Sequence, residues 1–137
     1  MTLADYQALA RFRRGLRSFL HFSEQVARAT GVTPAQHQLL LAIKGMAPAT
    51  APATAAAPTI GDVAEWLLLR HHSAVELVDR AAAAGLVTRA PDPDDARLQR
   101  LYLTADGEET LARLSELHRE ELRRLRPETV ANLLSLG

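Results

Sequence analysis

Polar side chains that can hydrogen-bond to bases or phosphates gather between residues 70 and 80: Arg70, His72, Ser73, Glu76 and Arg80. If this segment is a helix in the major groove of double-stranded DNA, its first turns face base edges, where a glutamate such as Glu76 can accept from a cytosine amino group. Arg80, farther along, would then contact phosphate. The structural alternative is that Ser73 or His72 caps the helix while Glu76 pairs with Arg80 four residues later. The residues alone leave both interpretations open.

The elements that must position these residues begin with two helices. Apolar residues recur at helical spacing from about Leu3 to Ala29, and Gly31 is suited to the left-handed conformation that follows a helix. Thr33-Pro34 then has the form of an N-cap followed by proline at the first helical position, with a helix expected up to Gly45. Residues 46–58 contain three prolines and no charge, which predicts a flexible Ala/Pro/Thr loop.

Two shorter helices are predicted after this loop. Thr59 and Asp62 have the spacing of a capping box at the start of the first. The second is expected from about His72 to Ala84, ending at Gly85. Its predicted buried side has the spacing i, i+3, i+4, i+7 and consists of Ala74, Leu77, Val78 and Ala81. Two helices of this length joined by a tight turn are typical of a helix-turn-helix.

The hydrophobic period then changes. Residues 86–89 and 98–103 are predicted strands, and residues 91–97 between them are dense in turn formers, so a β-hairpin with a charged tip is expected. An amphipathic helix is predicted from about Ala105 to Arg126, where Pro127 breaks or kinks it. The fold class is therefore mainly α with a small β-hairpin wing (α+β): a winged helix-turn-helix with long terminal helices.

Composition limits the functions that fit this fold. The 137 residues contain no cysteine, which excludes disulfides, thiolate zinc sites and thiol redox sensing. Sixteen basic residues balance sixteen acidic ones, and residues 59–104 carry five arginines against seven acids. A nucleic-acid partner would therefore be bound by a few well-placed arginines rather than by a broad positive field. No apolar run is long enough for a membrane span and no secretory signal is present, so a cytoplasmic protein is expected.

Three segments together resemble the MarR family of winged helix-turn-helix bacterial transcriptional regulators. They are the stretches 60–64 and 73–80, and Gly85-Leu86-Val87-Thr88-Arg89 after them. Asp95-Ala96-Arg97, then five residues, then Leu103-Thr104, is similar to the family's D-x-R-x-x-x-x-x-L-T wing signature, with Gly107 following at a matching place. The resemblance covers roughly residues 30–126. It favours DNA contact by Arg70, His72, Ser73, Glu76 and Arg80, and it implies a regulator that usually represses.

The same resemblance implies a role for Arg97 in the wing, where such an arginine contacts phosphate or enters the minor groove. The structural alternative is that Asp95 pairs with Arg97 and fixes the turn, and the two roles are compatible. This sequence departs from the family pattern at the tip, because Ala96 stands where a basic residue is common and three acids surround it. Those acids, which are Asp92, Asp94 and Asp95, oppose deep entry into the minor groove.

A homodimer on a near-palindromic operator is the expected assembly, because one helix-turn-helix contacts too few base pairs for useful specificity. The resemblance implies that the terminal helices intertwine. The expected organisation is a dimerisation helix over residues 1–30, a DNA-binding lobe over 31–104, and dimerisation helices over 105–137. The apolar stripes at the two ends, including Leu9, Phe12, Leu16 and Phe19, would form this interface, or else would close the core of the single chain.

Many MarR-like proteins release DNA when a small aromatic or anionic effector binds between the dimer helices and the DNA-binding lobe. By resemblance such a pocket would lie near Arg17, Phe19, His21 and Phe22, although aromatic residues at helical spacing also serve as core. Two i,i+3 pairs, His21 with Glu24 and His118 with Glu121, share a helix face, a spacing common by chance, and no metal site is expected.

The sequence also bears on two other classes of function. The sequence contains no glycine-rich phosphate loop, no nucleophile elbow and no His-Glu-x-x-His motif, so neither an enzyme nor a cofactor is expected. The remaining alternative is a winged helix that serves as a protein-interaction module without binding DNA. The neutral net charge and the acidic wing favour that alternative, and the family resemblance favours the regulator.

Overall fold

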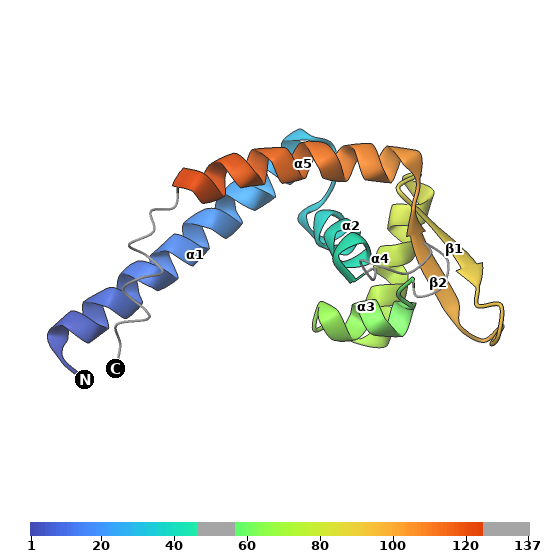
Figure 1. Ribbon diagram of the computed structural model, residues 1–137, viewed down its shortest axis with the longest axis horizontal. Helices are drawn as coiled ribbons and strands as arrows, with labels where there is room; N and C mark the ends of the chain where they lie inside the picture. Colours follow the sequence, from blue (N-terminus) through green and yellow to red (C-terminus); the bar gives the residue numbers. More distant parts are fainter. Residues whose placement is uncertain (47–56, 125–137) are drawn as a thin grey trace.

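The computed structural model describes residues 1–46 and 57–124. They form five helices and one two-stranded antiparallel sheet in the order α1, α2, α3, α4, β1, β2, α5. Figure 1 shows two long helices, α1 and α5, extending away from a lobe that contains the other elements. The predicted fold class, mainly helical with a β-hairpin, is confirmed within the described residues.

Helix α1 (Leu3–Ala29) has the bounds predicted from its periodicity. Thr2 caps its start: the Thr2 hydroxyl accepts from the Asp5 amide (3.2 Å) and the Asp5 carboxylate accepts from the Thr2 amide (2.6 Å). After its end Gly31 adopts φ 90°, the left-handed conformation that favours glycine. The chain can therefore turn sharply from α1 into the lobe.

Helices α2 (Pro34–Met46), α3 (Ile60–Trp66) and α4 (His71–Ala83) form the helical part of the lobe. Thr33 and Gln36 cap α2 reciprocally, and Thr59 and Asp62 do the same for α3, as predicted for that pair. Helix α4 begins at His71, one residue before the predicted start, and Gly85 follows it with φ 76°. The predicted helix-turn-helix is thus present as α3 and α4.

Strands β1 (Val87–Pro91) and β2 (Gln99–Leu103) form the predicted hairpin, with Arg89 opposite Leu101 and Ala90 opposite Arg100. Both strands begin one residue later than predicted, and Pro91, expected in the turn, ends β1. A third segment joins the hairpin beside β2, because Leu101 donates its amide to the Pro58 carbonyl and Thr59 forms an isolated antiparallel bridge with Arg100.

Helix α5 (Ala105–Arg124) starts directly after the hairpin. The Thr104 hydroxyl donates to the Gly85 carbonyl (2.6 Å) and accepts from the Gly107 amide (3.0 Å), which ties the start of α5 to the end of α4. The backbone of Gly107 lies against Leu86: an added Cβ would stand 2.1 Å from the Leu86 carbonyl oxygen. Glycine is therefore required here for a close approach of two backbones.

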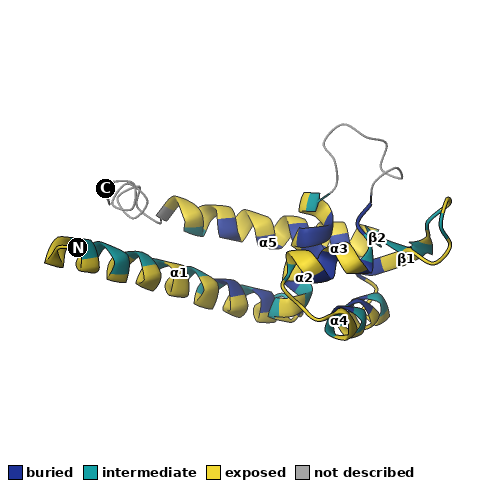
Figure 2. Cartoon of the chain, turned by 90° about the horizontal axis from the view of Figure 1, so that it is seen from below, coloured by how far each residue is buried: buried dark blue, intermediate teal, exposed yellow. Residues whose placement is uncertain are grey.

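The hydrophobic core lies where the helices of the lobe meet the hairpin and the start of α5. Its largest fully buried side chains are Leu39, Leu40, Val63, Val78, Leu101 and Leu114. Figure 2 shows that burial concentrates in this lobe, while α1 and α5, which contact each other, expose most of their surfaces. None of the described helices is long and apolar enough to cross a membrane.

Two predictions lie outside the described residues. The predicted flexibility of the loop 46–58 concerns mainly residues 47–56, and the predicted end of the last helix at Arg126, before Pro127, falls within residues 125–137.

Candidate nucleic-acid interface

Helix α4 presents one buried and one exposed face. Ala74, Val78 and Ala81 are fully buried in the lobe and Leu77 packs partly against it, so the predicted buried side of the helix is the one observed. On the other side Arg70, His72, Glu76 and Arg80 are exposed, and Ser73 is half-buried beside them. The structure thus gathers the five candidate residues along one accessible surface and leaves their polar groups available to a ligand.

The start of α4 differs from the prediction. Its N-cap residue is Arg70, and no side chain makes a capping hydrogen bond there, so neither Ser73 nor His72 caps the helix. The reason is geometric: with the helix beginning at His71, both residues lie inside its first turn. Among the ion pairs of residues 1–46 and 57–124, none joins Glu76 to Arg80. Neither the cap nor the pair is therefore formed among the described residues, and contact of these side chains with DNA stays a prediction.

An ion pair connects α4 to the hairpin: Arg89 on β1 donates to the carboxylate of Asp79. Both side chains are substantially exposed, so the pair contributes at most about 1 kcal/mol to stability. It is a weak contact between the hairpin and α4, beside the core packing that joins the two. Sequence reasoning missed this pair, because the two residues belong to different elements and no periodicity relates them.

Arg97, the residue of the hairpin predicted to contact DNA, is held at the tip by hydrogen bonds to Asp95. Arg97 donates from Nε and Nη2 to the two carboxylate oxygens of Asp95, at 3.0 and 3.2 Å, and its amide donates to the same carboxylate at 3.1 Å. These hydrogen bonds lower the pKa of Asp95 and raise that of Arg97. The predicted pairing is present, yet the Arg97 side chain stays 90% exposed. Its guanidinium is held by Asp95 through Nε and Nη2, and the rest of the side chain faces solvent.

A second arginine of the hairpin engages another acid of the tip. Arg100 approaches Asp92 with 3.5 Å between Nη2 and Oδ2, and it donates from Nη1 to the Ala57 carbonyl at 2.7 Å. Asp92 and Asp95 are thus both offset by arginines of the same hairpin. The tip is less repulsive toward a phosphate than its three acids alone would predict.

Two buried histidines meet where α1, α2 and α5 come together. His118 on α5 donates from Nδ1 to the Leu114 carbonyl (2.5 Å), so its Nε2 can accept from the Ser23 hydroxyl of α1 (2.7 Å). The ring of His37 on α2 lies 4.7 Å from that of His118, centroid to centroid. Burial, and secondarily the charge that His118 can carry, lowers the pKa of His37 from 6.5 to about 4. Sequence reasoning did not pair these residues, because they lie far apart along the chain.

The residues predicted for an effector pocket divide into two groups. Phe19 and Phe22 are half-buried and direct their rings edge-on toward His118, with centroids 5.7 Å apart in each case. Arg17 and His21 are exposed on α1. The aromatic pair thus lies at the junction between the long helices and the lobe, and the effector pocket stays a prediction.

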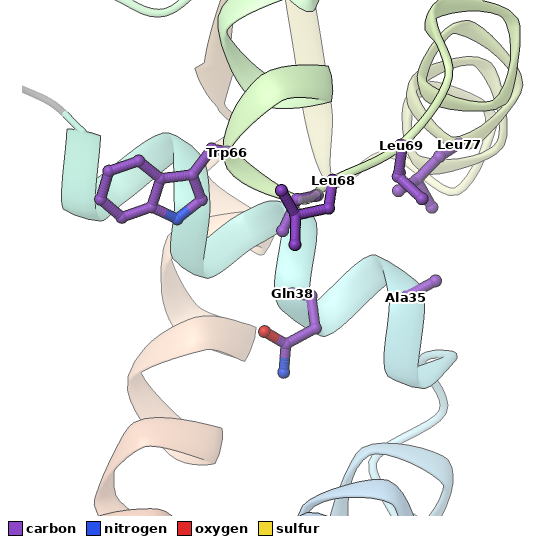
Figure 3. Close-up of a pocket in the computed structure, with 7 residues that line it drawn as sticks. Ala35, Gln38, Trp66, Leu68, Leu69 and Leu77 are labelled. Atoms are coloured by element: carbon purple, nitrogen blue, oxygen red, sulfur yellow. The ribbon is translucent and has the colours of Figure 1, made fainter.

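A pocket of about 390 Å³ lies elsewhere, beside the turn between α3 and α4 (Figure 3). Trp66 and Leu68 border it from the turn, and Leu68 is 92% exposed with the left-handed φ of 56°. Its remaining lining residues are Ala35, Gln38, Leu67, Leu69 and Leu77. None of the predicted effector residues lines this pocket.

The described residues contain no group of three or more His, Cys, Asp or Glu side chains that could hold a metal ion. His118, one of the histidines in the i,i+3 pairs, engages both ring nitrogens in hydrogen bonds. It therefore has no nitrogen free for a metal in this conformation.

Comparison with known proteins places these features in a family. A family model described as "MarR family" matches residues 30–98, which include α2, α3, α4, β1 and Arg97. A search of curated proteins found no match. The matched segment extends over half of the chain and covers most of the candidate interface.

Solved structures show the same fold over nearly the whole chain. AbsC, a MarR family transcriptional regulator from Streptomyces coelicolor, is 21% identical, with a TM-score of 0.74 over 97% of this chain and 88% of its own. A mutant of E. coli MarR complexed with operator DNA is 20% identical, with a TM-score of 0.69 over 99% and 96%. CouR from Rhodococcus jostii, bound to p-coumaroyl-CoA, is 22% identical, with a TM-score of 0.67 over 89% and 82%.

Proposed function

The chain belongs to the MarR family, and on that premise we propose that it is a sequence-specific regulator of transcription that binds double-stranded DNA as a homodimer. It acts in the cytoplasm as a repressor and catalyses no reaction. The observation that carries the proposal is the exposed polar face of α4, which is backed by a fully buried apolar face. A rigid helix with free hydrogen-bonding groups on one side is what base recognition requires.

In this proposal α4 lies in the major groove with its first turns toward the bases. His72, Ser73 and Glu76 contact base edges, and Glu76 accepts from a cytosine amino group. Arg70 and Arg80, at the two ends of the same surface, contact phosphates and fix the register of the helix. The DNA-bound MarR relative supports this mode of binding by likeness of fold.

The hairpin supplies the second contact. Arg97, 90% exposed and held by Asp95, reaches the phosphate backbone or the edge of the minor groove beside the site of α4. The buried Val87 and Leu101 anchor the hairpin in the same core as α4, and the exposed ion pair of Arg89 with Asp79 adds a weak contact between them. Both proposed contacts therefore belong to one lobe.

The long helices provide the dimer interface. Apolar side chains on α1 and α5 are exposed in the single chain, and their burial against a second copy would stabilise a dimer. The large ones are Leu3, Tyr6, Leu16, Leu20, Leu117 and Leu122. In this arrangement residues 1–30 and 105–137 dimerise and residues 31–104 form the DNA-binding lobe, twice per operator.

Release by a small aromatic or anionic effector completes the proposal. The site is the junction near Phe19 and Phe22, with Arg17 and His21 on the same helix available to an anionic group. Support comes from the placement of the two aromatic rings between the long helices and the lobe. The CouR relative was solved with p-coumaroyl-CoA, which has both an aromatic group and anionic groups.

The test is fluorescence anisotropy with DNA from upstream of the protein's own gene and an unrelated duplex, each at several salt concentrations. We expect binding to the upstream DNA to be roughly 1,000-fold tighter or more. Arg70→Ala should weaken binding and reduce the salt slope by about two, since each dimer loses two phosphate contacts, and Arg97→Ala should do the same. Arg13→Ala, which removes the same charge from α1, is the matched control and should leave both quantities unchanged.

A protein-interaction module is the competing function, because the net charge is zero and residues 59–104 carry more acids than arginines. For such a module, the arginine substitutions would not change DNA affinity beyond the Arg13→Ala control. Equal, weak binding to both duplexes, unaltered by either substitution, would count against regulation through DNA and favour this alternative.

A further inference from the structure

The most enclosed ion pair of the hairpin joins Arg100 to Asp92, whose side chains are 23% and 11% exposed. Arg100 also donates to the Ala57 carbonyl at 2.7 Å. One guanidinium therefore bridges two parts of the chain: the tip of the hairpin on one side and the segment that leads into α3 on the other. A planar guanidinium with several fixed donors is suited to this bridge.

The segment before α3 lies beside the hairpin at Arg100 for a second reason. Leu101 donates its amide to the Pro58 carbonyl at 2.9 Å, and Thr59 forms a backbone bridge with Arg100 itself. A hairpin of two strands is marginally stable alone. Val87 and Leu101 anchor its base in the core, whereas most of the tip between the strands is exposed. Residues 57–59 act as a partial third strand, and the side chain of Arg100 fastens that strand to the tip.

We propose that Arg100 is a positioning residue for the wing: by joining Ala57 to Asp92 it sets the direction in which the hairpin presents Arg97. Asp95 orients the side chain of Arg97 locally, whereas Arg100 orients the whole hairpin relative to α3 and α4. The effect on DNA rests on the proposed function, and the effect on the hairpin does not.

Removing the guanidinium leaves two groups without their partner. Asp92 keeps a largely enclosed carboxylate, and the carbonyl of the buried Ala57 loses a charged donor. Such groups recover their hydrogen bonds by moving toward water. We therefore expect the tip to swing away from residues 57–59 when Arg100 is replaced, while the core of the lobe stays folded.

The first test uses the free protein. Amide hydrogen exchange in the Arg100→Met variant should accelerate about tenfold or more at Asp92 and Leu101, the size expected for the loss of a hydrogen bond to a charged group. The Val78 amide in α4 should be unaffected. Arg13→Met is the matched control, since it removes the same charge from an exposed position on α1, away from the hairpin. Unchanged exchange at Asp92 and Leu101, or equal acceleration throughout the lobe, would overturn the proposal.

The second test measures the coupling between Arg100 and Arg97 in DNA binding. Arg97→Ala should weaken binding about tenfold in the parent protein and less than about twofold in the Arg100→Met background, because a displaced wing no longer brings Arg97 to DNA. A purely structural role of Arg100 gives equal losses in both backgrounds, which contradicts positioning. Arg100→Lys keeps the charge but cannot span both partners. If Arg100→Met folds poorly, Arg100→Lys takes its place, and the same reduced effect of Arg97→Ala is expected in that background.

The two tests separate the proposal from the function on which it rests. If Arg97→Ala has no effect in the parent protein, the wing does not contribute to DNA binding and the DNA part of the proposal is wrong. The exchange measurement still decides whether Arg100 orients the hairpin.

Discussion

His37 is the residue whose environment departs most from that of its free side chain. It is 3% exposed, and its Nδ1 has no hydrogen-bond partner among the described residues. Its pKa, about 4 in the folded protein against 6.5 in the unfolded chain, means that folding favours the neutral ring. The contribution of the neutral His37 ring to the free energy of unfolding is fully present above about pH 6.5, and it is lost as the pH falls toward about 4. The loss can reach about 3 kcal/mol.

Denaturant unfolding at a series of pH values tests whether His37 causes this pH dependence of stability. The parent protein should lose stability between about pH 6.5 and 4, and His37→Phe, which keeps a ring at that place, should remove most of that dependence. His21→Phe replaces an exposed histidine on α1 and should leave the dependence as it is. Parallel pH profiles for the parent and His37→Phe would show that other groups cause the acid instability.

Glu76 gives a prediction about sequence preference. If it accepts from a cytosine amino group, Glu76→Met, which has no oxygen acceptor, should relax the preference at one base pair per half-site by about 1–3 kcal/mol. Selection from randomised duplexes measures this directly. The control is Glu65→Met, which removes the same charge from an exposed site on α3. An unchanged base preference in Glu76→Met would remove Glu76 from the set of base contacts.

The residue scale is where prediction from sequence was least complete. The exposed face of α4 could be predicted, because helical period and residue type determine which side is polar. The partners of individual side chains could not. Arg89 with Asp79 and His37 with His118 each join different elements, and such pairs depend on tertiary packing that no local pattern encodes. For Ser73 and His72, a helix that starts one residue earlier than predicted places both inside the first turn, so the capping alternative is not the one observed.

Elements, in contrast, were predicted well where their ends carry chemical signals. Thr59 with Asp62 marks α3, and the glycines after α1 and α4 adopt the left-handed conformation expected of them. The strands have no such caps, and their ends were displaced by one or two residues. The most specific element-level signal was Gly107, whose place in the family pattern now has a physical reason in the backbone of Leu86.

Gly107→Ala should accordingly destabilise the protein by about 3 kcal/mol or more, because the new Cβ meets backbone rather than a flexible side chain. The matched control is Gly45→Ala on α2, where an added Cβ meets nothing within 4 Å. It should raise stability by about 0.5–1 kcal/mol through helix propensity. Urea unfolding of both variants checks the contrast. Comparable changes in the free energy of unfolding would contradict a requirement for glycine at position 107.

At the scale of the whole molecule, the prediction concerns assembly. Leu16→Glu places a charge on the exposed apolar surface of α1, and two-fold symmetry introduces it twice per dimer. The dimer should weaken by roughly 100-fold or more, with a parallel loss of operator affinity. Sedimentation at several concentrations measures the first and anisotropy the second. Leu41→Glu, at an exposed leucine of α2, should leave both unaltered; a dimer of parent-like affinity in Leu16→Glu would place the interface elsewhere.

Helix α5 begins at Ala105, directly after Thr104, whose hydroxyl is hydrogen-bonded just beyond the end of α4, and it then runs alongside α1. Its 20 residues correspond to about 30 Å of helix. In a dimer built on the long helices, the length and twist of α5 would therefore set the distance and the angle between the two copies of α4. Inserting a single alanine in α5 rotates everything beyond it by about 100°. Such a variant should remain folded and still bind a single half-site weakly, but it should no longer match the half-site spacing of its operator.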